Sequence, residues 1–119
     1  MATEYLMLSN IPANAVRDLM TQSDLGESDL RFVGRPSQVV YAAVANAVGI
    51  EITVKAGERT VVPRSILEAG GTTGVFPNMA EKANTFLAAA GEKLSFSVRE
   101  TAGVATTDIM LALSVEPIA

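Results

Sequence analysis

The sequence has 119 residues, the usual size of one compact domain, and it contains no histidine, cysteine or tryptophan. Hydrophobic residues make up 49% of the chain and aromatic residues only 5%, so we expect a core built from Ala, Val, Leu, Ile and Met. The formal net charge of −4 is the wrong sign for neutralising phosphates, and the missing Cys and His exclude disulfides, thiolate catalysis and the commonest general base and metal ligand.

The N-terminal third predicts one strand and one helix. The apolar run Tyr5–Ser9 predicts a short strand. After it, Asn10 is a suitable helix cap, Pro12 suits a first turn, and apolar residues follow at helical spacing. We therefore expect a short amphipathic helix over Ala13–Thr21, whose Leu19 and Met20 face the core or a second subunit. The first residues lack the basic region of a signal peptide, and no run of 18 apolar residues follows, so we expect a soluble, unprocessed protein.

The middle of the chain predicts further strands. In Val39–Val48 the Val-Val-Tyr run favours a strand and the alanines favour a helix, and periodicity does not decide between them. We favour a strand because the next run, Glu51–Lys55, alternates cleanly between polar and apolar residues. The segment Pro63–Phe86 is too long and too rich in glycine for a hairpin loop, and it is typical of a Greek-key sandwich in which a strand crosses to the opposite sheet.

The C-terminal part has the clearest pattern. Apolar residues alternate over Leu94–Val98 and again over Ile109–Val115, and the residues between contain Gly103. This pattern predicts a β-hairpin from Leu94 to Val115. The second strand is apolar or small on both faces, so we expect its outer residues, Met110, Ala112 and Ser114, to be covered by another sheet or another subunit.

A short self-similarity connects the two halves of the sequence. The pattern Ala-Gly-Glu-[Arg/Lys] occurs at Ala56–Arg59 and again at Ala90–Lys93, each time beside a predicted strand. Both copies predict turns, with Gly supplying a positive φ and the charged residues placed at an exposed edge. One match is too little for a repeat array.

Each candidate for chemistry has a simpler interpretation. The glycines of Gly70–Gly74 lack the Gly-Lys-Ser/Thr of a phosphate loop, so we expect a surface loop. The acidic stretch Asp24–Asp29 lacks the ligand spacing of an EF-hand, so we expect no metal. Without His, a serine nucleophile would need Lys55, Lys82 or Lys93 as its base, and no Gly-x-Ser-x-Gly is present. We expect neither an enzyme nor a cofactor.

A resemblance adds to this reading. Several segments resemble the single jelly-roll capsid and capsid-associated proteins of icosahedral bacterial viruses. They are Val62–Leu67, the Gly70-Gly71 loop, Ala90–Leu94 and the closing hairpin. The resemblance covers roughly Gly49 to Pro117 and is one of pattern. It implies an eight-stranded antiparallel sandwich, or jelly-roll-like barrel, that assembles through its sides. The predicted helix departs from a minimal barrel and leaves open whether the N-terminal third is an arm, an insertion or another fold.

The leading hypothesis is therefore a mainly β, single-domain virion protein, a capsid or capsid-decorating subunit that acts by homo-oligomeric assembly. Its partners would be its own copies and other virion proteins, without direct nucleic acid. The expected subunit contacts are small or apolar residues of the last strand and of the glycine-rich loop, namely Met110, Ala112, Ser114, Gly70, Gly71, Thr72, Thr73 and Phe76. The alternatives are a monomeric sandwich that binds a glycan or a protein, and a small α+β enzyme subunit that uses Lys and carboxylates.

Overall fold

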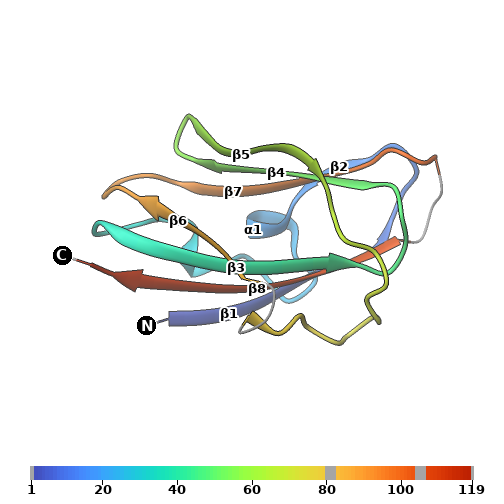
Figure 1. Ribbon diagram of the computed structural model, residues 1–119, viewed down its shortest axis with the longest axis horizontal. Helices are drawn as coiled ribbons and strands as arrows, with labels where there is room; N and C mark the ends of the chain where they lie inside the picture. The colour runs from blue at the N-terminus through green and yellow to red at the C-terminus, as the bar shows by residue number, and fades with distance from the viewer. Residues whose placement is uncertain (1, 80–82, 104–106, 119) are drawn as a thin grey trace.

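The computed structural model describes residues 2–79, 83–103 and 107–118, and over these ranges the chain is mainly β (Figure 1). Its strands are β1 (Ala2–Ile11), β2 (Val16–Asp18), β3 (Ser37–Ala45), β4 (Ile50–Ala56), β5 (Arg59–Ile66), β6 (Asn84–Ala88), β7 (Leu94–Glu100) and β8 (Thr107–Pro117). The helix α1 (Leu19–Gln22) and the 3-10 helix η1 (Asp29–Arg31) lie between β2 and β3. Neither of these described helices is long and apolar enough to cross a membrane.

The strands form two four-stranded antiparallel sheets, with orders β1-β8-β3-β6 and β2-β7-β4-β5. Strand β1 pairs with β8, β2 with β7, β3 with β6 and β4 with β5, so the pairing is nested from the middle of the chain outwards. Two packed sheets with this nesting are a jelly roll. The predicted antiparallel sandwich with one short helix is confirmed, and over the described strands the sheets stay separate instead of closing into a barrel (Figure 1).

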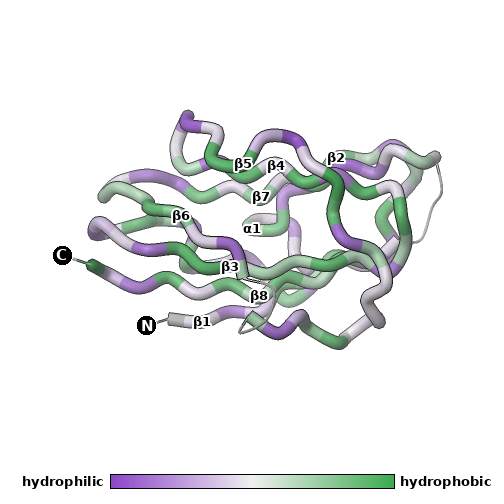
Figure 2. Tube along the Cα trace, in the orientation of Figure 1, coloured by the Kyte–Doolittle hydropathy of each residue, from purple (hydrophilic) through white to green (hydrophobic). Residues whose placement is uncertain are grey.

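The core lies between the two sheets and is built by alternation along each strand. In β4 the side chains of Ile52 and Val54 are buried, while Lys55 is exposed on the outer face. Figure 2 shows this interleaving of apolar and polar residues along the strands. Three of the few aromatic rings meet in the core, because Tyr41 and Phe86 of one sheet contact Phe96 of the other, with ring centroids 5.1 and 6.5 Å from that of Phe96.

The open question at Val39–Val48 is settled by β3, which is a strand over Ser37–Ala45. Its alanines favour a helix locally, but β3 lies between β8 and β6, and those two strands satisfy its backbone groups. Tertiary pairing therefore outweighs the intrinsic preference. The long connection after β5 crosses from one sheet to the other, as predicted, because β5 belongs to one sheet and β6 to the other.

The helix predicted over Ala13–Thr21 is wrong in its extent. Residues Val16–Asp18 form β2 and pair with β7, and the helix occupies only Leu19–Gln22. The carboxylate of Asp18 accepts a hydrogen bond from the Met20 backbone N–H at 3.0 Å and so caps the helix there. Leu19 and Met20 are buried in the core. Of the two positions expected for them, the core or a contact with a second subunit, the structure shows the core.

The predicted hairpin from Leu94 to Val115 is also wrong. Both strands exist, but β7 lies in one sheet between β2 and β4, and β8 lies in the other between β1 and β3. Strong alternation in two successive segments indicates two strands and carries no information about whether they pair with each other. Between the two predicted strands, residues 104–106 lie outside the described residues.

The two Ala-Gly-Glu-[Arg/Lys] turns lie side by side. The first joins β4 to β5 and the second joins β6 to β7. The Gly57 backbone N–H donates to the Lys93 carbonyl at 2.8 Å, and Arg59 forms an ion pair with Glu92 at 2.7 Å. Gly57 has a φ of 62°, and a Cβ there would lie 3.3 Å from the Glu92 carboxylate. The charged residues of the two similar turns therefore pair with each other.

The connections divide between the two ends of the sandwich (Figure 1). Those from β1 to β2, β3 to β4, β5 to β6 and β7 to β8 gather at one end, on the right of the view, which we call the loop end. Strand β1 begins and β8 finishes at the opposite end, which also carries the two similar turns and the residues that lead into β3. We call it the termini end.

Candidate functional site

A buried carboxylate, Asp108 at the start of β8, is hydrogen-bonded to the end of β1 and to two connections at the loop end. Its side chain accepts hydrogen bonds from the Asn10 backbone N–H at 2.8 Å and from the Thr73 hydroxyl at 2.5 Å. The side-chain amide of Asn46 donates to the same carboxylate at 3.4 Å, and the Asp108 backbone N–H donates to Asn46 Oδ1 at 2.9 Å. One carboxylate thus holds the end of β1, the residues after β3 and the residues after β5.

A second carboxylate also holds connections by hydrogen bonds, on the other side of the loop end. Glu100, at the end of β7, is buried and accepts hydrogen bonds from the backbone N–H groups of Asn14, Ala102 and Gly103 at 3.0, 2.9 and 2.8 Å. Hydrogen bonds from backbone N–H groups to a carboxylate are charge-assisted and stronger than neutral ones. We call the loop end braced because two side chains at strand ends, Asp108 and Glu100, hold its connections by hydrogen bonds.

The segment between β5 and β6 folds back over the outer face of the β1-β8-β3-β6 sheet. The Gly71 backbone N–H donates to the Ala45 carbonyl at 3.0 Å, and the Phe76 ring packs on Tyr5 with centroids 5.1 Å apart. A Cβ on Gly71 would lie 2.9 Å from the Val44 side chain, so the segment comes as close as a glycine allows. This contact explains why glycine stands at position 71.

The expected subunit contacts divide into two groups in the structure. Met110, Ala112 and Ser114 lie on the outer face of β8 and are buried within this single chain. The chain's own β5–β6 segment covers part of this face, beside Val44 and Tyr5. In the single chain the three side chains have almost no exposed surface. Gly70, Thr72 and Thr73 are exposed, whereas Gly71 and Phe76 pack partly against the sheet.

Two protruding apolar side chains at the loop end were not predicted. Val48, before β4, is 77% exposed, and Ile66, the last residue of β5, is 85% exposed. Both line one hollow of about 450 Å³ together with Glu51 and Thr101. The sequence carries no signal for this pair, because Val48 belongs to an alanine-rich run and Ile66 continues an apolar strand pattern. Only the pairing of β4 with β5 brings the two residues together.

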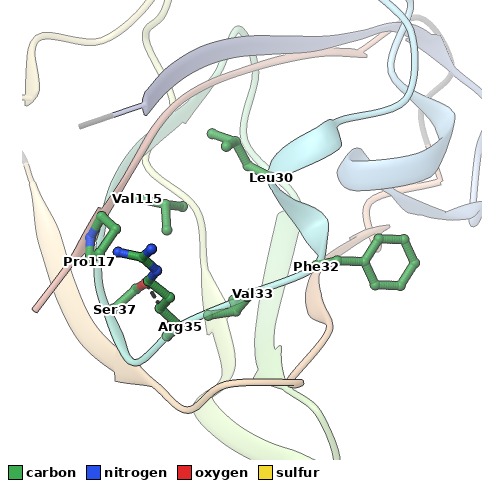
Figure 3. Close-up of a pocket in the computed structure, with 8 residues that line it drawn as sticks. Leu30, Phe32, Val33, Arg35, Ser37, Val115 and Pro117 are labelled. Carbon is green, nitrogen blue, oxygen red and sulfur yellow. Dashed lines mark hydrogen bonds between the residues drawn. The ribbon is translucent and has the colours of Figure 1, made fainter. Parts of the chain in front are cut away.

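A second hollow lies at the termini end (Figure 3). It has a volume of about 460 Å³, and its walls are mostly apolar side chains, contributed by Leu30, Val33, Val115 and Pro117. Arg35 and Ser37 provide the polar groups of the lining. The Phe32 ring points away from these residues (Figure 3). The Arg31 guanidinium lies over this ring, with 4.7 Å between the guanidinium carbon and the ring centroid.

The residues considered for catalysis and metal binding are dispersed. Lys55 is exposed on the outer face of β4, and the Lys93 ammonium lies 5.9 Å from the Phe32 ring centroid. The Asp24 carboxylate accepts a hydrogen bond from the Ser9 backbone N–H at 3.0 Å. Lys82 lies outside the described residues. Among the residues that are described, no group of three or more acidic side chains is placed to hold a metal ion.

Comparison with known proteins gives no further assignment. No model of a known protein family matches the chain, and no curated protein matches it either. The class is therefore defined by the architecture itself, which is a two-sheet antiparallel jelly roll with a braced loop end and an apolar hollow at each end.

Proposed function

We propose that this protein is a virion structural subunit, either a capsid or a capsid-decorating protein, that acts by homo-oligomeric assembly and turns over no substrate. Its partners are its own copies and other virion proteins, and its location is the virion. The nested strand order supports the proposal, because jelly rolls of this kind are a common fold of viral capsid proteins. The fold alone does not specify a function, which depends on the surface that the fold presents.

The observation that carries the proposal is the exposed pair Val48 and Ile66 at the loop end. Large apolar side chains that protrude together mark contact sites, because their exposure to water is unfavourable until a partner covers them. A second copy of the chain is the partner that such a pair fits, because a head-to-tail contact between identical subunits repeats around a ring or through a lattice.

The loop end is also prepared for contact because it is already ordered. Asp108 is hydrogen-bonded to Asn46, two residues before Val48, and Glu100 holds the residues that follow Thr101, which lines the same hollow as Val48 and Ile66. Association costs less when the contact surface does not have to be ordered on binding. Each contact then adds to the others over many copies, so that a small area per subunit is enough to hold a lattice.

Light scattering coupled to size-exclusion chromatography, followed by negative-stain microscopy, tests the proposal. We expect the protein to form rings, shells or lattices as its concentration rises, and we expect Val48→Ser with Ile66→Ser to shift it to smaller species. The matched control is Leu25→Ser, which removes a comparably exposed apolar side chain, 58% exposed, from the connection after α1 and should leave assembly unchanged.

A strictly monomeric protein at high concentration would contradict the proposal and favour a binding module. An assembly that the paired serine variant and the control weaken equally would also count against the loop end as the contact surface.

A further inference from the structure

The termini-end hollow has the form of a small-molecule pocket and is independent of the loop end. It lies where the chain passes from η1 into β3, beside the last residues of β8 (Figure 3). Val33 and Val115 form its buried wall, and Leu30 and Pro117 form its sides. Its volume of about 460 Å³ falls within the range of ligand sites, which is roughly 300 to 1,000 Å³.

The rim of this pocket is held in place by hydrogen bonds. The Ser37 hydroxyl donates to the Arg35 carbonyl at 2.8 Å, and the Ile118 backbone N–H donates to the Pro36 carbonyl at 2.9 Å. The first bond fixes the segment that carries Arg35, and the second ties the end of β8 to that segment. The pocket is therefore formed before any ligand arrives, as most ligand sites are.

The charge at the pocket is positive. The guanidinium group of Arg35 is directed towards Pro117 and Val115 (Figure 3). Within the described part of the chain Arg35 forms no ion pair, whereas Arg31, Arg59 and Arg64 each pair with a glutamate. A guanidinium group presents a planar fork of donors that matches a carboxylate, and it keeps its charge at any physiological pH.

We propose that the termini-end pocket binds an acyl chain that carries a carboxylate. The apolar walls of Leu30, Val33, Val115 and Pro117 hold the hydrocarbon chain, and the Arg35 guanidinium holds the carboxylate at the rim. The mostly apolar lining selects against nucleotides and sugars, which would bring many polar groups into contact with side chains that cannot hydrogen-bond to them.

Calorimetry with octanoate, and with uncharged octan-1-ol of the same chain length, tests this assignment. We expect octanoate to bind at neutral pH and octan-1-ol to bind about ten-fold more weakly, because the alcohol lacks the charge-assisted pair. Arg35→Gln should weaken octanoate binding by about the same factor and leave octan-1-ol binding unchanged. Arg99→Gln, which removes one positive charge from β7 on the other sheet, is the matched control and should change neither affinity.

A second variant tests the apolar walls separately. Leu30→Trp places a larger side chain at the edge of the pocket and should abolish the binding of both ligands, with an unchanged circular dichroism spectrum as the check on folding. In the unmodified protein, octanoate should shift the methyl resonances of Val33 and Val115 and leave those of Val48 in place.

Several outcomes would overturn the assignment. They are no octanoate binding at millimolar concentration, binding that Arg35→Gln leaves intact, and methyl shifts confined to residues outside the pocket. Binding to vesicles of phosphatidylglycerol that octanoate does not compete with would identify a membrane surface as the source of the anion instead. None of these results bears on assembly through the loop end, so the two proposals are tested independently of each other.

Discussion

Asn46 and Asp108 continue the pairing of β3 with β8 beyond the last backbone ladder pair, Ala45 with Ile109. The Asn46 backbone N–H donates to the Asp108 carbonyl at 3.0 Å, and the Asp108 backbone N–H donates to the side-chain oxygen of Asn46 at 2.9 Å. The side chain thus replaces a backbone acceptor at the point where the strand ends. The Asp108 carboxylate is left free to accept bonds from the neighbouring connections.

Asp108→Ala should destabilise the fold through these connections. It removes the carboxylate that accepts from the Asn10 N–H and from the Thr73 hydroxyl, and the expected loss is about 1 to 3 kcal/mol of unfolding free energy. Urea denaturation measures the loss, and hydrogen exchange at the Asn10 amide should accelerate in parallel. Glu58→Ala, in the exposed turn after β4, is the control and should change stability by less than about 0.5 kcal/mol.

Gly71→Ala should disturb the segment that covers the outer face of β8. The new methyl group would lie 2.9 Å from one Val44 methyl and 3.2 Å from the Ala45 carbonyl oxygen. We expect a cost of about 1 to 3 kcal/mol, from strain or from lifting of the segment. A lifted segment would expose Met110 and Ala112, so binding of a hydrophobic dye should increase.

Gly34→Ala is the matched control for that experiment. Its methyl group would meet no atom within 4 Å, and its φ is not positive, so stability should stay the same or rise slightly. Equal losses in the two variants would argue against close packing at Gly71.

The contrast between these elements shows what the sequence could predict. Alternation identified β4, β7 and β8 as strands because each has one face towards the core. Which strands pair was not readable, since β7 and β8 are adjacent in the chain and belong to different sheets. The helix over Ala13–Thr21 failed for a similar reason, because pairing of β2 with β7 overrides helical spacing in a short segment.

The candidate surfaces were harder to predict than the strands. Apolar residues on both faces of β8 correctly indicated a covered outer face, but the cover comes in part from Gly71 and its neighbours in the same chain. A pattern of burial does not say whether the covering atoms are intramolecular. The pair Val48 and Ile66 becomes adjacent only through the pairing of β4 with β5.

The Arg59–Glu92 ion pair predicts that the stability of the contact between the two turns depends on pH. The hydrogen bond from Arg59 and then the bond from the Ala89 backbone N–H hold the pKa of the Glu92 carboxyl below its ordinary value of 4.5. A carboxyl whose pKa is lowered by folding contributes stability above its unfolded pKa and loses that contribution as the pH falls through the lowered value. The contact between the two turns should therefore weaken in acid, below about pH 4.5.

Arg59→Gln should raise the pKa of Glu92 only part of the way, because the Ala89 bond remains. Carbon-13 NMR of the Glu92 carboxyl measures the change. Arg64→Gln, which breaks a pair with Glu51 instead, should leave the pKa of Glu92 where it is. An identical titration in all three proteins would show that Arg59 does not control this carboxyl.

The buried Tyr41 predicts a loss of folding stability at alkaline pH. Burial between the sheets raises the pKa of its phenol above the ordinary value of 10.0, because the charged form is poorly solvated there. The stability that depends on the neutral phenol is complete below about pH 10 and is lost as the pH rises through the raised pKa.

A Tyr5→Phe background leaves Tyr41 as the only tyrosine, so its ionisation can be followed by ultraviolet absorbance. The midpoint should lie above pH 10.0 and coincide with loss of structure. In the same background Tyr41→Phe keeps the ring contact with Phe96 and should move alkaline unfolding to higher pH. Unchanged alkaline stability in that variant would exclude Tyr41 as the cause.

The nested strand order also has a consequence for biosynthesis. Strand β8 is the last strand of the described chain, and yet it lies inside its sheet between β1 and β3. The β4–β5 hairpin is available early and locally, whereas β1 has no strand to pair with until β8 has left the ribosome. The first strand therefore stays without its partner until the residues of β8 have been made. Loops of this length close slowly, so we expect the final insertion of β8 to limit the rate at which newly made chains complete the fold.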